Sequence, residues 1–127
     1  MNGEDIVLDT NILLYFLNGD PNVRQFLYDY NPIISFISEL ELLSAPEISE
    51  NEKLFIRELL SAVTIIEYSE RYKEDIVRLR ATKKLKLPDA IITSLAITLG
   101  IPLVTADKAL KNIQETDIIF YKTPDNG

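Results

Sequence analysis

The chain has 127 residues, of which 46% are hydrophobic and 26% are charged, so we expect one folded domain and not a disordered polypeptide. Its 13 basic and 20 acidic residues give a net charge of −7, which argues against a broadly basic nucleic-acid-binding surface or a polybasic membrane binder. Histidine and cysteine are both absent, which excludes Ser–His–Asp triads, cysteine nucleophiles, disulfides and ordinary catalytic zinc sites.

Short apolar stretches alternate with segments of helical pattern along the chain. In chain order, we expect a strand at 6–8, helical segments at 12–17 and 20–30, a strand at 32–36, helices at 40–43 and 49–62, a strand at 63–67, helices at 69–85 and 88–100, and strands at 102–105 and 118–121. Asp20 followed by Pro21 favours a helix start, and Gly100 favours a helix end.

The predicted strands are nearly continuous apolar runs, which indicates a parallel sheet covered by helices on both faces. We therefore predict an α/β fold, a three-layer α/β/α sandwich whose central, mainly parallel sheet has about five strands. Residues 1–122 are expected to form this single domain and residues 123–127 a frayed tail. In such folds, ligands bind beyond the carboxyl ends of the strands, near the point where the strand order reverses.

No segment reads as a targeting signal or a membrane span. Glu4, Asp5 and Asp9 occupy the region where a signal peptide needs a basic start and an apolar run. The longest uncharged stretch, residues 90–106, includes hydroxyl residues and falls short of the about 20 apolar residues that a span requires. We expect a cytoplasmic protein that does not enter a membrane.

Glycines at positions 3, 19, 100 and 127 cannot form a Walker A or GxGxxG loop. The composition leaves carboxylates, hydroxyls, lysines and any hard cation that the carboxylates bind as catalytic groups, so we look first at the acidic residues. Three acidic residues follow predicted strands: Asp9 after the first, Glu41 in the helix after the second, and Asp107 after the fourth. Asp89 lies in the helix before the fourth strand. Each also has a structural interpretation, since an aspartate caps a helix or complements its dipole and a glutamate is often a solvated surface residue.

Three segments together resemble the sequence blocks of the PIN-domain family, and more closely its small VapC-like toxin ribonucleases. They are IVLDTNILLYFL at 6–17, SFISELELL at 35–43 and LPDAIITSLAITLGIPLVTADKAL at 87–110. The resemblance covers nearly the whole chain. It implies a PIN-like fold, in which the start of the helix bearing Asp89 reaches the carboxyl edge of the sheet, although crossover direction alone makes that placement awkward.

The resemblance also implies which residues form the site. The catalytic and metal-binding acids would be Asp9, Glu41, Asp89 and Asp107, supported by Asn11 and Thr105. Glu39 is the alternative to Glu41 in this segment. The family's pattern places its glutamate six residues after a serine at the end of a strand, here Ser35, and so favours Glu41. Many relatives carry arginine immediately before the last aspartate, where this chain has Ala106, and this difference weakens the inference of a phosphate contact nearby.

A cluster of acids suits Mg²⁺ or Mn²⁺, which prefer oxygen ligands. Such ions generate hydroxide near neutral pH and stabilise the charged transition state of phosphodiester hydrolysis. Two carboxylates ~5 Å apart repel by about 3 kcal/mol at an effective dielectric of 20, so four of them repel by on the order of 10 kcal/mol. The site should therefore need a cation, a shared proton or a partner's arginine.

The stretch RLRATKKLK at 78–86 offers a local basic surface in an acidic chain. Lys83, Lys84, Lys86 and Lys108 are candidate nucleic-acid-binding residues. An equally weighted interpretation is that the stretch only complements the carboxyl end of a helix.

We expect a Mg²⁺- or Mn²⁺-dependent endoribonuclease that hydrolyses RNA phosphodiester bonds, the toxin of a toxin–antitoxin pair, with a small antitoxin as partner and, by resemblance, a homodimeric state. The alternative is a catalytically weak PIN-like module that holds a partner protein or nucleic acid. A receiver-like or phosphatase-like domain with an aspartyl nucleophile fits poorly, because Thr10 and Asn11 follow Asp9 and no DxD pair appears there.

Overall fold

A parallel sheet forms the centre of the computed structural model, which describes residues 3–123. Within these residues the sheet has five strands in the order β3-β2-β1-β4-β5, and every neighbouring pair is parallel. The strands are β1 (Glu4–Leu8), β2 (Tyr30–Ser35), β3 (Thr64–Ile66), β4 (Leu103–Thr105) and β5 (Ile118–Phe120). The predicted parallel sheet is thus confirmed.

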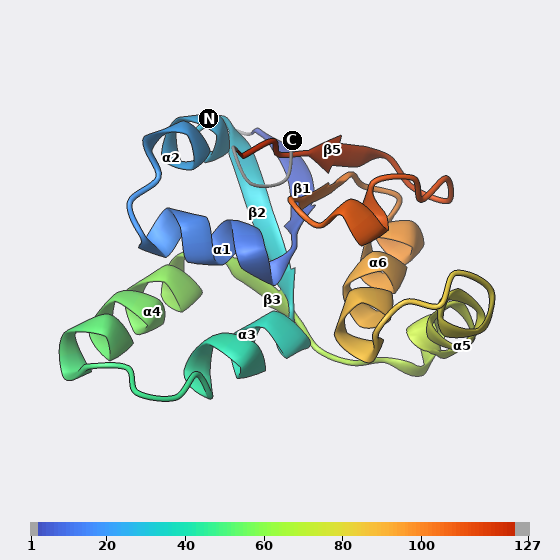
Figure 1. The fold of residues 1–127 in the computed structure, drawn as a ribbon, viewed down its shortest axis with the longest axis horizontal. Coiled ribbons are helices and arrows are strands. Elements are labelled where there is room, and N and C mark those ends of the chain that lie inside the picture. Colours follow the sequence, from blue (N-terminus) through green and yellow to red (C-terminus); the bar gives the residue numbers. More distant parts are fainter. Residues whose placement is uncertain (1–2, 124–127) are drawn as a thin grey trace.

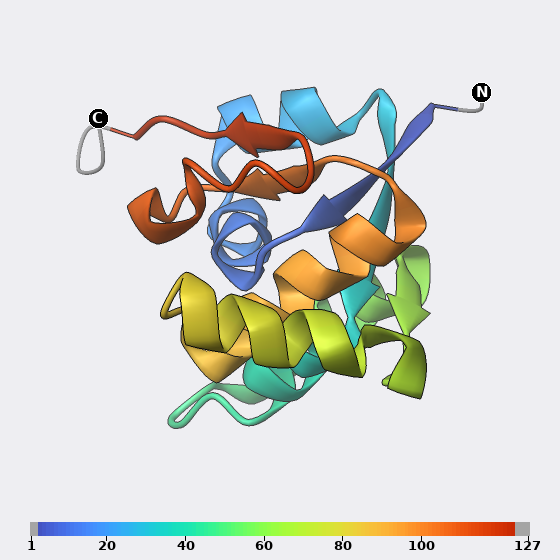
Figure 2. The ribbon, with the colours of Figure 1, turned by 90° about the vertical axis from the view of Figure 1, so that its right-hand side faces the viewer.

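Helices cover both faces of this sheet, so the predicted three-layer α/β/α sandwich is also confirmed (Figure 1). The α-helices are α1 (Thr10–Leu17), α2 (Pro21–Leu27), α3 (Phe36–Leu43), α4 (Glu50–Ala62), α5 (Lys73–Thr82) and α6 (Leu87–Leu99). Two short 3-10 helices, η1 (Glu70–Tyr72) and η2 (Lys108–Leu110), complete the described elements. Figure 2 shows the molecule from the side that α5 and α6 cover.

Alternate residues of β1 supply two separate cores, one on each side of the sheet. Val7 packs with residues of α5 and α6, whereas Ile6 and Leu8 pack with residues of α1, α2 and α4. All three side chains are fully buried, and such burial stabilises a fold by about 1.5–3 kcal/mol for each side chain. The central strand is therefore held on both faces, which fixes the position of the residue that follows it, Asp9.

Three predicted helices have clearly different boundaries in the structure. The helix predicted at 40–43 begins at Phe36, which was predicted as the end of a strand, because the Ser35 hydroxyl accepts from the Ile37 N–H and caps α3. The helix predicted at 20–30 ends at Leu27, because Pro32 disfavours a helical Asn31 and Tyr30 already pairs with Glu4 in the sheet. The segment predicted as one helix at 69–85 consists of η1 and α5, and α5 ends at Thr82. Lys84 then adopts a left-handed conformation (φ 56°), and Leu85 returns to the core.

Two further expectations concern the C-terminal tail and the absence of a membrane span. Apart from Thr123, the tail predicted at 123–127 lies outside the described residues. Over residues 3–123, no helix combines the length and the apolar character needed to cross a bilayer.

Candidate active site

The strand order reverses between β1 and β4, which are neighbours at the centre of the sheet. From β1 the chain builds outward through β2 and β3 on one side, and β4 and β5 lie on the other. Leu8 pairs with Val104, and the Asp9 N–H donates to the Val104 carbonyl over 2.9 Å. Asp9 and Thr105 thus lie side by side at the carboxyl edge, where parallel α/β sheets bind ligands.

Asp9 is a buried carboxyl group with two defined hydrogen-bond donors. It caps α1: its Oδ1 accepts from the Thr10 N–H at 2.8 Å, while its Oδ2 accepts from the Thr105 hydroxyl at 2.6 Å. The side chain is only 5% exposed. Burial raises its pKa, as do the charges of Asp107 and Glu41, against the opposing effect of the two hydrogen bonds. Helix capping therefore does not account for the whole environment of Asp9.

Asp107 is held in place by the two residues expected to support the site. Its N–H donates to Thr105 Oγ1 at 3.0 Å, and the N–H of the preceding residue, Ala106, donates to Asn11 Oδ1 at 3.4 Å. Its own Oδ1 accepts from the Ala109 N–H at 2.9 Å and caps η2. Asn11 and Thr105 therefore connect the loop that carries Asp107 to the end of β1.

Glu41 reaches the same region from α3. Its Oε1 accepts a hydrogen bond of 2.6 Å from the hydroxyl of Thr10, the first residue of α1. Glu41 is also the glutamate of this segment whose charge raises the pKa values of both Asp9 and Asp89. This placement favours Glu41 over Glu39 as the glutamate of the site.

Asp89 lies in the first turn of α6 and is half-buried. Burial, followed by the charges of Asp9 and Asp107 and, to a lesser extent, Glu41, raises its pKa to about 6, while Lys86 opposes this shift. Since α6 leads into a parallel strand, it runs back along the sheet and starts at the carboxyl edge. The placement that seemed awkward from crossover direction thus follows from the fold.

The four acids therefore form one electrostatic cluster, made of Asp9, Glu41, Asp89 and Asp107. Among residues 3–123, no group of three or more acidic side chains is arranged so that it could hold a metal ion. Mg²⁺ does not require such a cage, because it usually keeps several waters and binds one or two carboxylates together with substrate phosphates. The donor set, composed of carboxylate oxygens, fits a hard divalent cation.

We expect the raised pKa of Asp89 to make metal-free stability depend on pH. Because the charged form is disfavoured in the folded state, this group's contribution falls as pH rises from about 4, the unfolded pKa, to about 6 and remains lost above that. After discounting for partial exposure, the loss is about 1–2 kcal/mol. Asp89→Asn should thus match the wild type near pH 4 and exceed its free energy of unfolding above pH 6.

Urea unfolding in EDTA at several pH values measures this difference. Asp29→Asn, at an exposed position on the loop after α2, is the matched control and should follow the wild type throughout. A constant difference between Asp89→Asn and wild type from pH 4 to pH 7 would contradict the raised pKa that burial and the neighbouring acids give Asp89.

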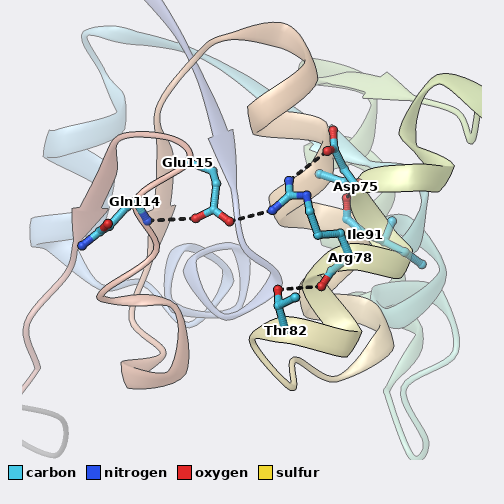
Figure 3. A network of polar contacts seen from close by, with 7 residues as sticks. Asp75, Arg78, Thr82, Ile91, Gln114 and Glu115 are labelled. Carbon is cyan, nitrogen blue, oxygen red and sulfur yellow. Dashed lines mark hydrogen bonds and ion pairs between the residues drawn. The ribbon is translucent and has the colours of Figure 1, made fainter.

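The basic residues of the stretch at 78–86 have different acidic neighbours. Arg78 pairs with Asp75 at 2.9 Å and with Glu115 at 2.8 Å (Figure 3), and the charge of Lys83 acts on Glu115. Lys86 instead acts on Asp89. Of the predicted lysines, Lys86 therefore lies beside the acid cluster, and the exposed Lys108 follows Asp107 directly in the sequence.

Thr10 bonds to two acids of the cluster and Ser38 contacts Thr10, although neither residue was predicted to belong to the site. Their hydroxyl oxygens lie 2.9 Å apart, although 28 positions separate them in the chain. The sequence does place each residue near an acid. Thr10 follows Asp9 directly, and Ser38 precedes Glu41 by three residues, so that Ser38 and Glu41 share one face of α3.

Comparisons with known proteins agree with this architecture. A sequence profile of the PIN domain matches residues 6–116, whereas no curated protein sequence matches the chain. A chain of a toxin–antitoxin complex from Klebsiella pneumoniae is 31% identical, with a TM-score of 0.80, and the match covers 93% of this chain and 99% of that one.

Two further solved structures share the fold at lower identity. They are VapBC2 from Rickettsia felis bound to a promoter DNA fragment (22% identity, TM-score 0.78, 93% and 99% coverage) and DNA-bound VapBC from Salmonella typhimurium (20%, 0.81, 92% and 98%).

Proposed function

Because this chain belongs to the PIN domain family, we propose that it is a Mg²⁺- or Mn²⁺-dependent endoribonuclease and the toxin of a toxin–antitoxin pair. The single observation that carries the proposal is the electrostatic cluster of Asp9, Glu41, Asp89 and Asp107 at the reversal of strand order. Family membership and this cluster support the same activity.

In this proposal, one or two carboxylates of the cluster, together with water and substrate phosphate, would hold each divalent cation. One or two such cations would supply hydroxide and stabilise the charged transition state. The chain's own groups keep the carboxylates in place. The Thr105 hydroxyl and the Thr10 N–H fix both oxygens of Asp9, and Asn11 secures the loop of Asp107. Hydrolysis that breaks the bond to the 3′ oxygen leaves a 5′-phosphate and a 3′-hydroxyl, and it does not need the 2′-hydroxyl of RNA.

Lys86 and Lys108 are proposed to attract the RNA backbone to this acidic site. Both are exposed, and each lies close in sequence to one of the acids. Replacing both with glutamate should weaken RNA binding by about tenfold. The slope of log affinity against log salt concentration should become shallower by an amount equivalent to about one to two phosphate contacts.

Filter binding or fluorescence anisotropy over a range of salt concentrations measures this effect. Lys53→Glu is the control, since Lys53 pairs with Glu50 on α4, a helix of the opposite face. An unchanged affinity and salt slope in the double variant would contradict a role for these lysines.

An antitoxin partner is proposed from the Klebsiella pneumoniae relative and from an apolar surface of this chain. Exposed Leu14 on α1 and Phe55 on α4 line a hollow together with Leu42, Ala45 and Ile48. Contiguous exposed apolar side chains commonly mark protein-binding surfaces. Tyr15 and Phe16, also in α1, are not part of this hollow, because they pack against the core. A homodimer is proposed from family resemblance alone.

Cleavage of a structured RNA, with and without Mn²⁺ or Mg²⁺, tests the proposed function. We expect metal-dependent cutting that EDTA abolishes, and a DNA strand of the same sequence shows whether the activity is selective for RNA. RNA that stays intact with every metal would overturn the nuclease proposal and favour the binding module.

A further inference from the structure

A directed chain of hydrogen bonds runs from a buried hydroxyl to the glutamate of the cluster. The Thr10 hydroxyl has one proton and donates it to Glu41 Oε1 over 2.6 Å. Ser38 Oγ lies 2.9 Å from the same Thr10 oxygen. Since Thr10 has no second hydroxyl proton, Ser38 must be the donor in that pair. The order is therefore Ser38 to Thr10 to Glu41.

The burial of Ser38 supports the direction of this hydrogen-bond chain. Ser38 is fully buried in α3, where a hydroxyl without an acceptor costs about 1–3 kcal/mol, so its proton is committed to Thr10. Glu41, in contrast, is exposed, and a free glutamate side chain samples several rotamers. The short charge-assisted bond from Thr10 restricts that freedom.

Thr10 also connects two acids of the cluster. Its backbone N–H donates to Asp9 Oδ1 at 2.8 Å, while its side chain donates to Glu41, 31 positions away in the sequence. The start of α1 and the face of α3 are thus tied together at the point where the two carboxylates act on each other.

We propose that Thr10, and Ser38 through it, are positioning residues that hold Glu41 in the orientation the nuclease site requires. This inference rests on the proposed function. A purely structural tie between α1 and α3 would change stability and leave turnover intact, whereas a positioning role lowers kcat because Glu41 is no longer held in place for the reaction.

Thr10→Val removes the hydroxyl and keeps the branched shape, and Thr10→Ser restores the hydroxyl. We expect Thr10→Val to lower kcat for Mn²⁺-dependent RNA cleavage by about tenfold with KM changed by less than about twofold. Thr10→Ser should retain most activity, and Ser38→Ala should lower kcat by about threefold. In a Glu41→Gln background, Thr10→Val should have no further effect.

Thr82→Val is the matched control. Thr82 ends α5, and its hydroxyl donates to the carbonyl of Arg78 in the same helix at 2.7 Å (Figure 3). Neither residue belongs to α1 or α3. If Thr10→Val behaves like Thr82→Val, or if its effect adds fully to that of Glu41→Gln, the positioning role is overturned. Should Thr10→Val fail to fold, Ser38→Ala decides the question by the same kcat and KM criteria.

Mn²⁺ binding to the metal-free protein separates this inference from the proposed function. Isothermal titration calorimetry with Mn²⁺ alone should show affinity lowered by about threefold or more in Thr10→Val and unchanged in Thr82→Val. A wild-type chain that cuts no RNA refutes the proposed nuclease, yet this loss of affinity would still support Thr10 as a positioning residue. Equal Mn²⁺ affinity in Thr10→Val and Thr82→Val overturns the positioning role of Thr10.

Discussion

Asp9→Asn is expected to lower Mn²⁺-dependent RNA cleavage by about a thousandfold while leaving the chain folded. The amide oxygen can still accept from the Thr10 N–H, but the charge is lost and the Thr105 hydroxyl loses its carboxylate acceptor. Burial and the neighbouring acids raise the pKa of Asp9, so its charge destabilises the metal-free fold near neutral pH. Neutralising it should therefore raise the free energy of unfolding in EDTA.

Asp20→Asn provides a closely matched control. Asp20 caps α2, accepts from the backbone N–H groups of Asn22 and Val23, and accepts a hydroxyl bond from Tyr121 at 2.9 Å. Desolvation acts in the opposite direction, yet these hydrogen bonds lower the pKa of Asp20. Its neutralisation should therefore reduce stability and leave cleavage unchanged. Equal losses of stability in both variants, with cleavage retained in Asp9→Asn, would show that Asp9 is only a helix cap.

The second large effect distinguishes two glutamates two positions apart. Glu41→Gln should lower cleavage by about a hundredfold, whereas Glu39→Gln should change it by less than about twofold. Glutamine still offers an oxygen to the Thr10 hydroxyl, so the loss reports the missing charge. Steady-state kinetics with a defined RNA measures both variants. Comparable activities of the two would contradict the assignment of Glu41.

Most of the fold, and the positions of Asp9 and Asp107 at the carboxyl edge of the sheet, were predictable because local sequence determines them. Asp9 directly follows an apolar strand, so the parallel sheet itself carries it to the carboxyl edge. Asp107 follows β4 in the same way. Asp89 was harder to place, because its position depends on the direction of α6, which is a property of the whole crossover.

Contacts between distant segments were not predictable from motifs. The Thr10–Glu41 bond joins residues 31 positions apart, and Arg78 pairs with Glu115 37 positions away. No local pattern encodes such pairings, because they depend on how α3 meets α1 and how the loop before β5 meets α5. For the same reason, the basic stretch at 78–86 looked more uniform in the sequence than it is in the structure.

The most direct test of the cluster is a crystal of the wild-type chain soaked in Mn²⁺ and measured at an X-ray wavelength where manganese scatters anomalously. We predict an anomalous peak in contact with at least two of the carboxylates of Asp9, Glu41, Asp89 and Asp107, and no such peak in Asp9→Asn crystals treated identically. A wild-type crystal with no peak there, or with manganese bound only elsewhere on the surface, would contradict a metal-dependent site at this edge of the sheet.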